Sequence, residues 1–275
     1  MACDKIKLCN QGDVCTLKEY KKYCIFLDID GTLIGSNKEA FAENIDTIQR
    51  TRALGHKVFI STGRATSYLP EELNLSVNFD GAITGAGAVS KVGNKVLSEN
   101  LMPYDIVRKY ADFAIQHRIS AMMEGRDKLY HFGFSEWVPS DDERWVKLDR
   151  DNIDNVLTAE VPIEKFTISG EIPKTLDELL GEDYVILRYS NYGEVIQKNR
   201  GKGKALLEMA EILGIPAENT VAIGDSVNDL DMIEAAGIGI AMGNACEELK
   251  TVADMITDDV DDAGVSKALK KIFNL

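Results

Sequence analysis

The feature that most constrains the fold is a short apolar run, residues 23–27 (YCIFL), that ends directly in the polar sequence DIDGT. A short apolar run that stops at a glycine turn is typical of a buried strand in a parallel sheet. Apolar side chains then recur at helical spacing over residues 37–54, and a second apolar run at 58–60 ends in STGR. The order strand, helix, strand predicts a βαβ unit.

The last third of the chain repeats this order. Gly214 ends a segment with one apolar helical face, and the apolar run that follows it ends in GDSVND. The elements that we expect here are strands at 220–223, 238–242 and 253–256 and helices at 205–213, 230–236 and 266–273. The two halves together predict an α/β fold with a Rossmann-like parallel-sheet core, built from residues 23–85 and 191–275.

Residues 86–190 follow a different pattern. Two helical segments, near 105–117 and 174–180, are interleaved with segments in which apolar and polar residues alternate. Alternation of this kind predicts strands of a sheet with one exposed face. We therefore expect an inserted α+β domain over residues 86–190, and a polar N-terminal leader over residues 1–22.

The charge balance narrows the range of partners. The 275 residues include 31 Lys and Arg against 45 Asp and Glu, a net charge of −14. An acidic surface repels nucleic-acid phosphates and anionic lipids, so we expect no nucleic acid and no membrane among the partners. No segment approaches the roughly 20 apolar residues of a membrane span, and the first residues lack the apolar block of a secretory signal. We expect a cytoplasmic protein.

The cysteines and histidines are few and scattered. The chain has five cysteines and three histidines, and the cysteines form no CxxC pair. The spacing therefore does not favour a structural zinc site or a disulfide framework. We expect reduced thiols.

Polar side chains follow three of the predicted core strands. Asp28 and Asp30 come after the first strand, Ser61 and Thr62 after the second, and GDSVND after the strand at 220–223. Ligands of open parallel sheets bind beyond the carboxyl ends of the strands. We therefore expect these groups to meet in one crevice, which Lys202 could also reach.

Asp28 and Asp30 project the same way if the chain stays extended between them. Two crowded carboxylates favour a cation between them or a proton on one of them. With a cation bound, Asp28 stays ionised and can attack phosphorus, while a protonated Asp30 can donate to the leaving oxygen and later accept a proton from water. Taken alone, DxDG fits a turn with a helix cap equally well.

The sequence Ser61-Thr62-Gly63-Arg64 offers hydroxyl and backbone N–H donors suited to a phosphate oxygen. A helix N-cap is the alternative interpretation of this sequence. Lys202 could neutralise the charge that builds on phosphorus in the transition state. Its alternative is a solvated basic start of a helix.

Asp225 follows the strand at 220–223 directly. Asp28 and Asp225 would together supply the oxygen ligands that Mg²⁺ prefers, with water and substrate phosphate completing an octahedron. Asn228 could hydrogen-bond the phosphate or the nucleophile, and Asp229 could orient Lys202 or a metal-bound water. The loop spacing of a calcium EF-hand is absent.

Taken in order, these segments resemble the four motifs of the haloacid dehalogenase superfamily: DIDGTL from Asp28, STGR from Ser61, Lys202 with Gly203, and GDSVND from Gly224. The TGR form of the second motif and the long insert before Lys202 resemble the Cof-type phosphatases, which carry a C2-type cap. The sequences AMGNA and DDAGV late in the chain also resemble stretches of those proteins. The resemblance spans roughly residues 23–273, and the cap matches by position more than by sequence.

The resemblance implies that Asp28 forms an aspartyl-phosphate and that Asp30 is the general acid and base. It implies a Mg²⁺ site made by Asp28, the backbone carbonyl of Asp30 and Asp225. The groups expected to hold the phosphate are Thr62, Gly63, Asn228 and Lys202. The residues expected to support the site are Ser61, Arg64, Asp229 and Asn244.

The chain also departs from that family. Its members often show Asn-Gly-Ala at the entry to the cap, where this chain has Ala86-Gly87-Ala88. The missing amide places one substrate contact there in doubt, but not the chemistry. The leader at 1–22 is longer than such proteins usually need.

The sequence therefore predicts a Mg²⁺-dependent phosphatase that acts on a small phosphorylated metabolite, with a sugar phosphate favoured. The alternatives are a phosphomutase on the same core and a non-enzymatic phospho-acceptor switch, although a switch gives no reason for Asp30 as an acid or for a cap. Specificity is expected in the cap, where each candidate is more often structural than a ligand contact. The polar and aromatic candidates are Glu124, Arg126, His131, Trp137, Trp145, Arg188 and Tyr189.

Overall fold

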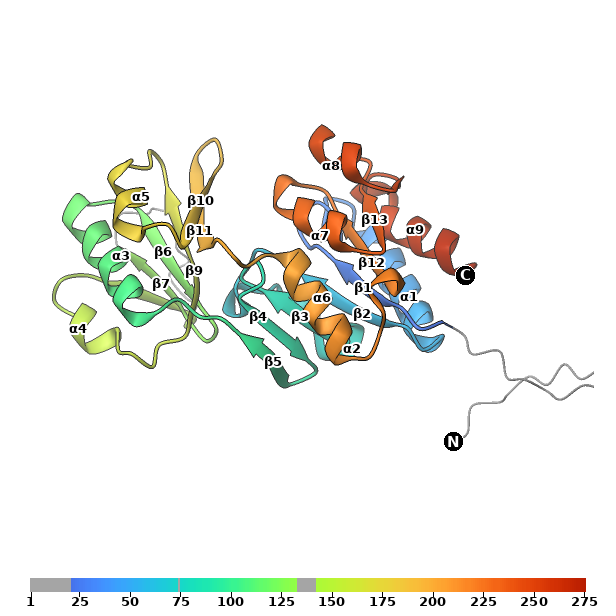
Figure 1. The fold of residues 1–275 in the computed structure, drawn as a ribbon, viewed down its shortest axis with the longest axis horizontal. Coiled ribbons are helices and arrows are strands. Elements are labelled where there is room, and N and C mark those ends of the chain that lie inside the picture. The colour runs from blue at the N-terminus through green and yellow to red at the C-terminus, as the bar shows by residue number, and fades with distance from the viewer. Residues whose placement is uncertain (1–20, 74, 133–141) are drawn as a thin grey trace, which may run out of the picture.

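The computed structural model describes residues 21–73, 75–132 and 142–275, which form two β-sheets with helices packed on them (Figure 1). The described part has two lobes, one around each sheet, and the first lobe carries both the beginning and the end of the described chain (Figure 1). Most of the predicted leader lies outside the described residues, and so does Trp137.

The first sheet has eight strands within the described part of the chain, in the order β14-β13-β12-β1-β2-β3-β4-β5. The strands from β14 to β3 run parallel, and β4 and β5 add an antiparallel hairpin at one edge. The strand bounds are β1 Cys24–Leu27, β2 Lys57–Ser61, β3 Gly81–Thr84, β4 Val89–Val92, β5 Lys95–Glu99, β12 Thr220–Gly224, β13 Ile238–Ala241 and β14 Met255–Ile256. The central strands are buried along nearly their whole length, as strands covered on both faces must be.

Helices cover this sheet in packed pairs. The side chain of Asn37 accepts hydrogen bonds from first-turn backbone N–H groups and so begins α1, Lys38–Ala53. α1 packs against α9, Gly264–Phe273, through a 2.7 Å hydrogen bond between the hydroxyls of Thr47 and Ser266. The other helices of this lobe are α2 Leu75–Asn78, α6 Lys202–Ile212, α7 Leu230–Ala235 and α8 Glu247–Val252, with α6 packed on α7.

The order of the strands reverses at β1, which lies between β2 and β12. Right-handed crossovers place α1, which joins β1 to β2, and α7, which joins β12 to β13, on opposite faces of the sheet. In open α/β sheets, ligands bind beyond the carboxyl ends of the strands at such a reversal. The predicted α/β fold with a Rossmann-like parallel core is confirmed, and its ligand crevice is expected beyond β1 and β12.

The second sheet has the order β10-β11-β9-β6-β7-β8. Its strands are β6 Ala121–Gly125, β7 Leu129–Phe132, β8 Trp145–Leu148, β9 Ile163–Ser169, β10 Tyr184–Arg188 and β11 Tyr192–Gln197. The helices of this lobe are α3 Tyr104–His117, α4 Ile153–Val156 and α5 Thr175–Leu180. An apolar core fills the space between one face of the sheet and α3 and α5. Its centre is Tyr110 of α3 stacked on Phe166 of β9, with 4.2 Å between the ring centroids.

The insert was expected to begin at residue 86 and to end at residue 190. In the structure the chain passes from the first sheet to the second, and back again, later than these two positions. β4 and β5 lie after residue 86, but they extend the first sheet because Gly93, at a φ of +54°, allows the chain to fold back as a hairpin. β11 lies after residue 190, but it pairs with β9 and β10 in the second sheet. Two short segments therefore carry the chain between the lobes, around residue 101 and around residue 199.

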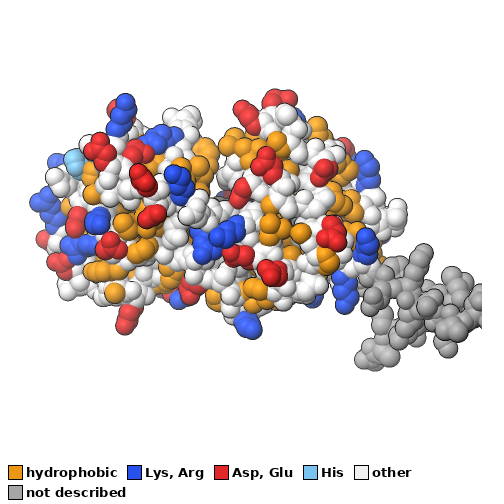
Figure 2. Space-filling model, viewed as in Figure 1, with side chains coloured by type: hydrophobic (Ala, Val, Ile, Leu, Met, Phe, Trp, Pro, Cys, Tyr) orange, Lys and Arg blue, Asp and Glu red, His pale blue; other side chains and the backbone are white. Residues whose placement is uncertain are grey.

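Charged side chains of both signs are interspersed over the face of the molecule shown in Figure 2, with no large basic patch on that face. None of the described helices is both long and apolar enough to cross a bilayer. Among the described cysteines, Cys24 is buried and Cys246 is partly buried, and both are free thiols.

Candidate active site

Asp28 lies at the carboxyl end of β1, beside β12, at the point where the strand order reverses. Its carboxylate is buried and accepts a 2.7 Å hydrogen bond from the ammonium group of Lys202. The same ammonium group donates to Asp229 at 2.6 Å and to the side-chain oxygen of Asn228 at 3.2 Å. Lys202 is 1% exposed, so its charge is balanced almost entirely by these two carboxylates.

Lys202 is the first residue of α6, where a positive charge opposes the helix dipole. Asp231 offsets this locally, because its carboxylate accepts a 2.9 Å hydrogen bond from the backbone N–H of Gly203. The space around Gly201 and Gly203 is also filled by Asp231, so a Cβ at either glycine would collide with it. The start of α6 is therefore held in one place, and Lys202 with it.

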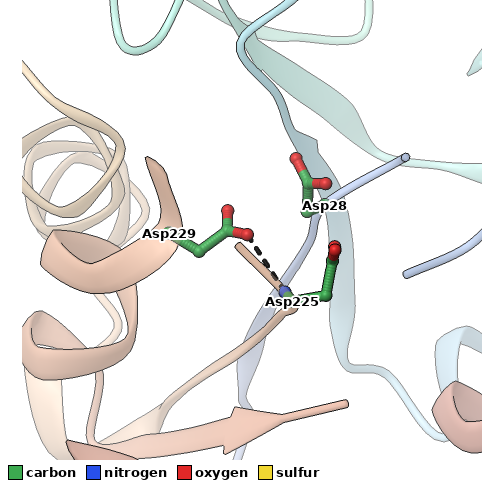
Figure 3. A group of neighbouring side chains, drawn as sticks. All are labelled: Asp28, Asp225 and Asp229. Atoms are coloured by element: carbon green, nitrogen blue, oxygen red, sulfur yellow. Dashed lines mark hydrogen bonds between the residues drawn. The ribbon is translucent and has the colours of Figure 1, made fainter. Parts of the chain in front are cut away.

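Three carboxylates, from Asp28, Asp225 and Asp229, lie together beyond the ends of β1 and β12 (Figure 3). Each offers an oxygen atom within 4.8 Å of the others. Both oxygens of Asp229 already accept hydrogen bonds, one from Lys202 and the other from the backbone N–H groups of Asp225 and Ser226. Asp28 and Asp225 are therefore the two side chains best placed to ligate a hard divalent cation through oxygen.

The protonation of these carboxylates reflects their crowding. Burial, together with the charge of Asp229, raises the pKa of Asp28 well above its usual range, and Lys202 opposes this shift. Burial also raises the pKa of Asp225 to about 6, against a 2.9 Å hydrogen bond from the hydroxyl of Thr32. A bound cation would relieve this repulsion, so the donor set fits a divalent metal ion.

Asp30 has different partners, because the chain turns directly after Asp28 instead of staying extended. The guanidinium of Arg64 donates to both carboxylate oxygens of Asp30 at 2.7 Å, and it lies 5.0 Å from the ring centroid of Tyr68. The pairing with Asp30 raises the pKa of Arg64. The turn depends on Gly31, at a φ of +82°, where a Cβ would lie 2.4 Å from a carboxylate oxygen of Asp225.

The sequence STGR lies at the carboxyl end of β2, next to β1. Thr62 is buried, and its hydroxyl accepts a 3.1 Å hydrogen bond from the backbone N–H of Arg64. Gly63 leaves room above this turn, and a Cβ there would lie 3.5 Å from the side-chain nitrogen of Asn228. Ser61 is also buried, and its hydroxyl has no hydrogen-bond partner among the described residues.

Asn244 supports the turn that follows Asp28. Its side-chain amide donates to the backbone carbonyl of Gly31 at 2.8 Å and accepts from the backbone N–H of Val260 at 3.0 Å. It thereby ties the turn after Asp28 to the loop that precedes α9. The structure thus brings every predicted site residue to one end of the first sheet, with Asn244 behind the turn.

A cavity of about 810 Å³ lies between the two lobes. On the core side it is lined by Asp28, Asp30, Thr62, Gly63, Arg64, Tyr68, Ser226 and Asn228. On the side of the second lobe it is lined by Met122, Glu124, Lys165, Thr167, Ser169, Tyr189, Asn191, Tyr192 and Glu194. The second lobe therefore forms one wall of the cavity over the site.

Two of the cap candidates from the sequence, Glu124 and Tyr189, line this cavity. Arg126 and Arg188 instead form ion pairs with Glu99 and Asp177. The rings of His131 and Trp145 meet edge to face, at 6.0 Å between centroids, and neither is among the described residues that line the cavity.

Three supporting residues were not identified from the sequence: Thr32, Asp231 and Glu194. Thr32 and Asp231 lie within or directly beside the motifs, so their position was a usable signal. Glu194 gave no such signal, because only the pairing of β11 with β9 turns it toward the cavity.

The comparisons with known proteins agree with this geometry. Residues 25–269 match the family model of the haloacid dehalogenase-like hydrolases. The chain is 29% identical over 272 residues to the 5-amino-6-(5-phospho-D-ribitylamino)uracil phosphatase YitU of Bacillus subtilis, covering 94% of this chain and 100% of that protein. It is 31% identical over 252 residues to the phosphatase YcsE of the same organism, which is named for the same substrate, covering 90% of this chain and 94% of that protein.

A solved structure with the same fold is that of BT4131, a haloacid dehalogenase subclass IIB sugar phosphatase. It superimposes with a TM-score of 0.76 at 27% identity, over 92% of this chain and 100% of the other. The chain described here belongs to the haloacid dehalogenase-like hydrolases. It is an enzyme, a phosphatase of that family.

Proposed function

We propose that this enzyme is a Mg²⁺-dependent phosphatase that hydrolyses a small phosphorylated metabolite through an aspartyl-phosphate on Asp28. The observation that carries the proposal is the setting of Asp28. It is buried at the strand reversal, bonded to Lys202, beside Asp225, and open to the cavity between the lobes. A nucleophilic carboxylate needs such neighbours, because it must stay ionised while it approaches an anionic phosphate.

Two bond changes make up the first half-reaction. A carboxylate oxygen of Asp28 attacks phosphorus, and the bond between phosphorus and the ester oxygen breaks. A protonated Asp30 supplies the proton that the leaving oxygen takes up. Lys202, the hydroxyl of Thr62 and the backbone N–H of Gly63 stabilise the charge on the phosphoryl oxygens, because the backbone N–H of Thr62 already donates to the carbonyl of Ile83. When bound by Asp28, the backbone carbonyl of Asp30 and Asp225, Mg²⁺ supplies charge neutralisation and orients the phosphate.

In the second half-reaction, water attacks the phosphorus of the aspartyl-phosphate and the Asp28 carboxylate leaves. The carboxylate of Asp30 takes up the proton that this water loses, which restores the starting state. Both oxygens of Asp30 accept hydrogen bonds from Arg64 in the present structure. Arg64 thereby holds Asp30 beside the cavity.

We further propose that the lobe from α3 to β11 is the cap that selects the substrate, and that the substrate is a sugar phosphate or a related polyol phosphate. The cap side of the cavity supports this assignment, because it is lined by polar side chains and tyrosines. Two of the similar proteins are named as acting on a phosphoribityl compound, and BT4131 is named as a sugar phosphatase.

Hydrolysis of p-nitrophenyl phosphate tests the chemistry. We expect Mg²⁺-dependent release of inorganic phosphate by the wild type and a loss of about 10³-fold or more in Asp28→Asn. Asp46→Asn, the same substitution at an exposed position of α1, is the matched control and should keep the wild-type rate. An inactive wild type in Mg²⁺, or an Asp28→Asn variant of full activity, would overturn the proposal.

Identifying the phosphorylated product distinguishes the proposed phosphatase from a phosphomutase and from a phospho-acceptor switch. A phosphomutase would transfer the phosphoryl group to a second sugar hydroxyl without net release of phosphate. A phospho-acceptor switch would accumulate the aspartyl-phosphate without turnover.

A further inference from the structure

The cap turns one face of its sheet toward Asp28. Side chains alternate along β6, β9 and β11, so one set enters the apolar core under α3 and α5 and the other set faces the cavity. The cavity-facing set is Met122, Glu124, Lys165, Thr167, Ser169, Tyr192 and Glu194. In the register of the sheet, Glu124 of β6 is paired with Lys165 of β9, and Glu194 of β11 is paired with Thr167 of β9.

Lys165 lies between two carboxylates on this face. Its ammonium group donates to Glu194 and lies 3.5 Å from Glu124, and its side chain is only 3% exposed. Glu124 also accepts a 2.5 Å hydrogen bond from the hydroxyl of Thr167. Burying these charges is costly, and the apolar core of the lobe lies on the opposite face of the sheet. Glu124, Lys165 and Glu194, which we call the array, are therefore better explained by a ligand than by packing.

The array presents acceptor, donor and acceptor in a row. An ammonium group has three N–H donors. Lys165 uses one to donate to Glu194 and lies 3.5 Å from Glu124 as an ion pair, so a donor remains for a ligand. Each carboxylate can accept further hydrogen bonds through its second oxygen. A hydroxyl group both donates and accepts, so two or more neighbouring hydroxyls can donate to Glu124 and Glu194 while one accepts from Lys165.

The array also begins close to the phosphoryl site. The second carboxylate oxygen of Glu194 lies 3.8 Å from the position that a Cβ on Gly63 would take. Gly63 belongs to the turn that is proposed to hold the phosphate. A hydroxyl that donates to Glu194 must therefore stand on a carbon close to the ester oxygen.

The charges of the cavity restrict the rest of the substrate. Its cationic lining residues, within the described chain, are Lys165 and Arg64, and each is already bonded to carboxylates. A second phosphate or a carboxylate on the substrate has only acceptors to offer, and it would face Glu124 and Glu194. Like charges at such short range repel, and burial strengthens the repulsion.

We propose that Glu124, Lys165 and Glu194 are specificity-determining residues that select phosphate monoesters of neutral polyols and reject leaving groups with a second anionic group. The preferred polyol carries hydroxyls on the carbons that follow the ester. This inference rests on the proposed phosphatase function, and it adds which atoms of the substrate are recognised.

Three matched four-carbon substrates test the proposal with the wild-type enzyme in Mg²⁺. Erythritol 4-phosphate has the hydroxyls, butyl phosphate lacks them, and 4-phosphoerythronate replaces the terminal hydroxymethyl group with a carboxylate. We expect kcat/KM to be about 10-fold or more higher for erythritol 4-phosphate than for either of the others. Equal values for the three substrates would overturn the proposal.

The variant Glu194→Gln keeps the shape of the side chain and removes its charge. We expect KM for erythritol 4-phosphate to rise by about 10-fold and the discrimination against 4-phosphoerythronate to shrink. The rate with p-nitrophenyl phosphate, which has no aliphatic hydroxyls, should change less than the rate with erythritol 4-phosphate. Glu178→Gln, the same change on the exposed side of α5, should alter neither.

The readouts separate failure of this inference from failure of the proposed function. If the wild type hydrolyses p-nitrophenyl phosphate but does not discriminate among the three substrates, only the specificity assignment is wrong. If the wild type hydrolyses none of the four esters, the phosphatase chemistry is wrong. A Glu194→Gln variant with unchanged KM and unchanged discrimination would also overturn the specificity assignment, provided that its thermal unfolding matches the wild type.

Discussion

The core and the proposed cap each bury a lysine between two carboxylates, and Asp28 on one side and Glu124 and Glu194 on the other line the same cavity. In the core, Lys202 lies between Asp28 and Asp229 at the ends of parallel strands. In the cap, Lys165 lies between Glu124 and Glu194 in the middle of a sheet face.

The two clusters differ in how they are held. Lys202 is fixed by a helix start that Asp231 anchors, and its neighbours Asp225 and Asp229 are locked by backbone N–H groups and Thr32. The cap cluster is held mainly by cross-strand contacts between side chains. A cluster at strand ends can approach a reacting atom closely, whereas a cluster on a sheet face offers a broad surface. The first is therefore suited to phosphorus and the second to the leaving group.

Lys202→Met should produce the larger loss. Removing the donor beside Asp28 should lower kcat for p-nitrophenyl phosphate and for polyol phosphates alike, by about 10²- to 10³-fold. Steady-state kinetics on both substrates checks this, with Lys204→Met, an exposed neighbour on α6, as the control. A loss confined to polyol phosphates would contradict the assignment of Lys202 to the phosphoryl group.

Lys165→Met should affect the two substrates differently. We expect kcat/KM for erythritol 4-phosphate to fall by about 10-fold, chiefly through KM, while p-nitrophenyl phosphate stays within about threefold. The exposed residue Lys174 provides the control variant Lys174→Met. If both substrates lost activity equally in a variant with normal thermal unfolding, the two lysines would share one role and the comparison would fail.

Mg²⁺ should stabilise the core more at pH 8 than at pH 6. Folding raises the pKa of Asp28 and raises that of Asp225 to about 6. Raised carboxyl pKa values add stability at low pH, and this contribution is lost as the pH rises through them. At pH 8 Mg²⁺ competes with fewer protons and relieves more repulsion.

Thermal unfolding measures this effect. We expect saturating Mg²⁺ to raise Tm by about 5 °C at pH 8 and by less at pH 6, with Na⁺ at matched ionic strength as the control. An equal rise at both pH values would argue against ligation by these carboxylates.

Asn244→Ala should have the smallest effect. It removes the hydrogen bonds to Gly31 and Val260 and so should cost about 1 kcal/mol of stability. Because the turn at Gly31 packs on Asp225, kcat should also fall severalfold while KM for erythritol 4-phosphate is unchanged. An altered KM would place Asn244 in contact with the substrate.

Much of the core followed from local sequence. The short apolar runs around Cys24 and Thr220, and the helix that Asn37 begins, were predicted because strand burial, helical periodicity and capping act over a few residues. The convergence of Asp28, Thr62, Lys202 and Asp225 was predicted because parallel strands end at the same edge of a sheet.

Other features needed contacts that no local pattern encodes. From the sequence, the hairpin of β4 and β5 was predicted to belong to the insert, yet it joins the first sheet. Asp30 was expected beside Asp28, yet its two oxygens are bonded to Arg64 across the turn.

The sequence by itself therefore determined the α/β core and the residues gathered at the ends of its strands, because those depend on short-range patterns. The order of the strands in the sheet came from the tertiary structure. The tertiary structure alone decided that Lys165 meets both Glu124 and Glu194, and that Glu194 reaches the turn at Gly63. The pairing of β9 with β11 and with β6 sets these contacts, which join Lys165 to Glu194, 29 residues apart, and Glu124 to Lys165, 41 residues apart. Such pairings depend on the whole sheet.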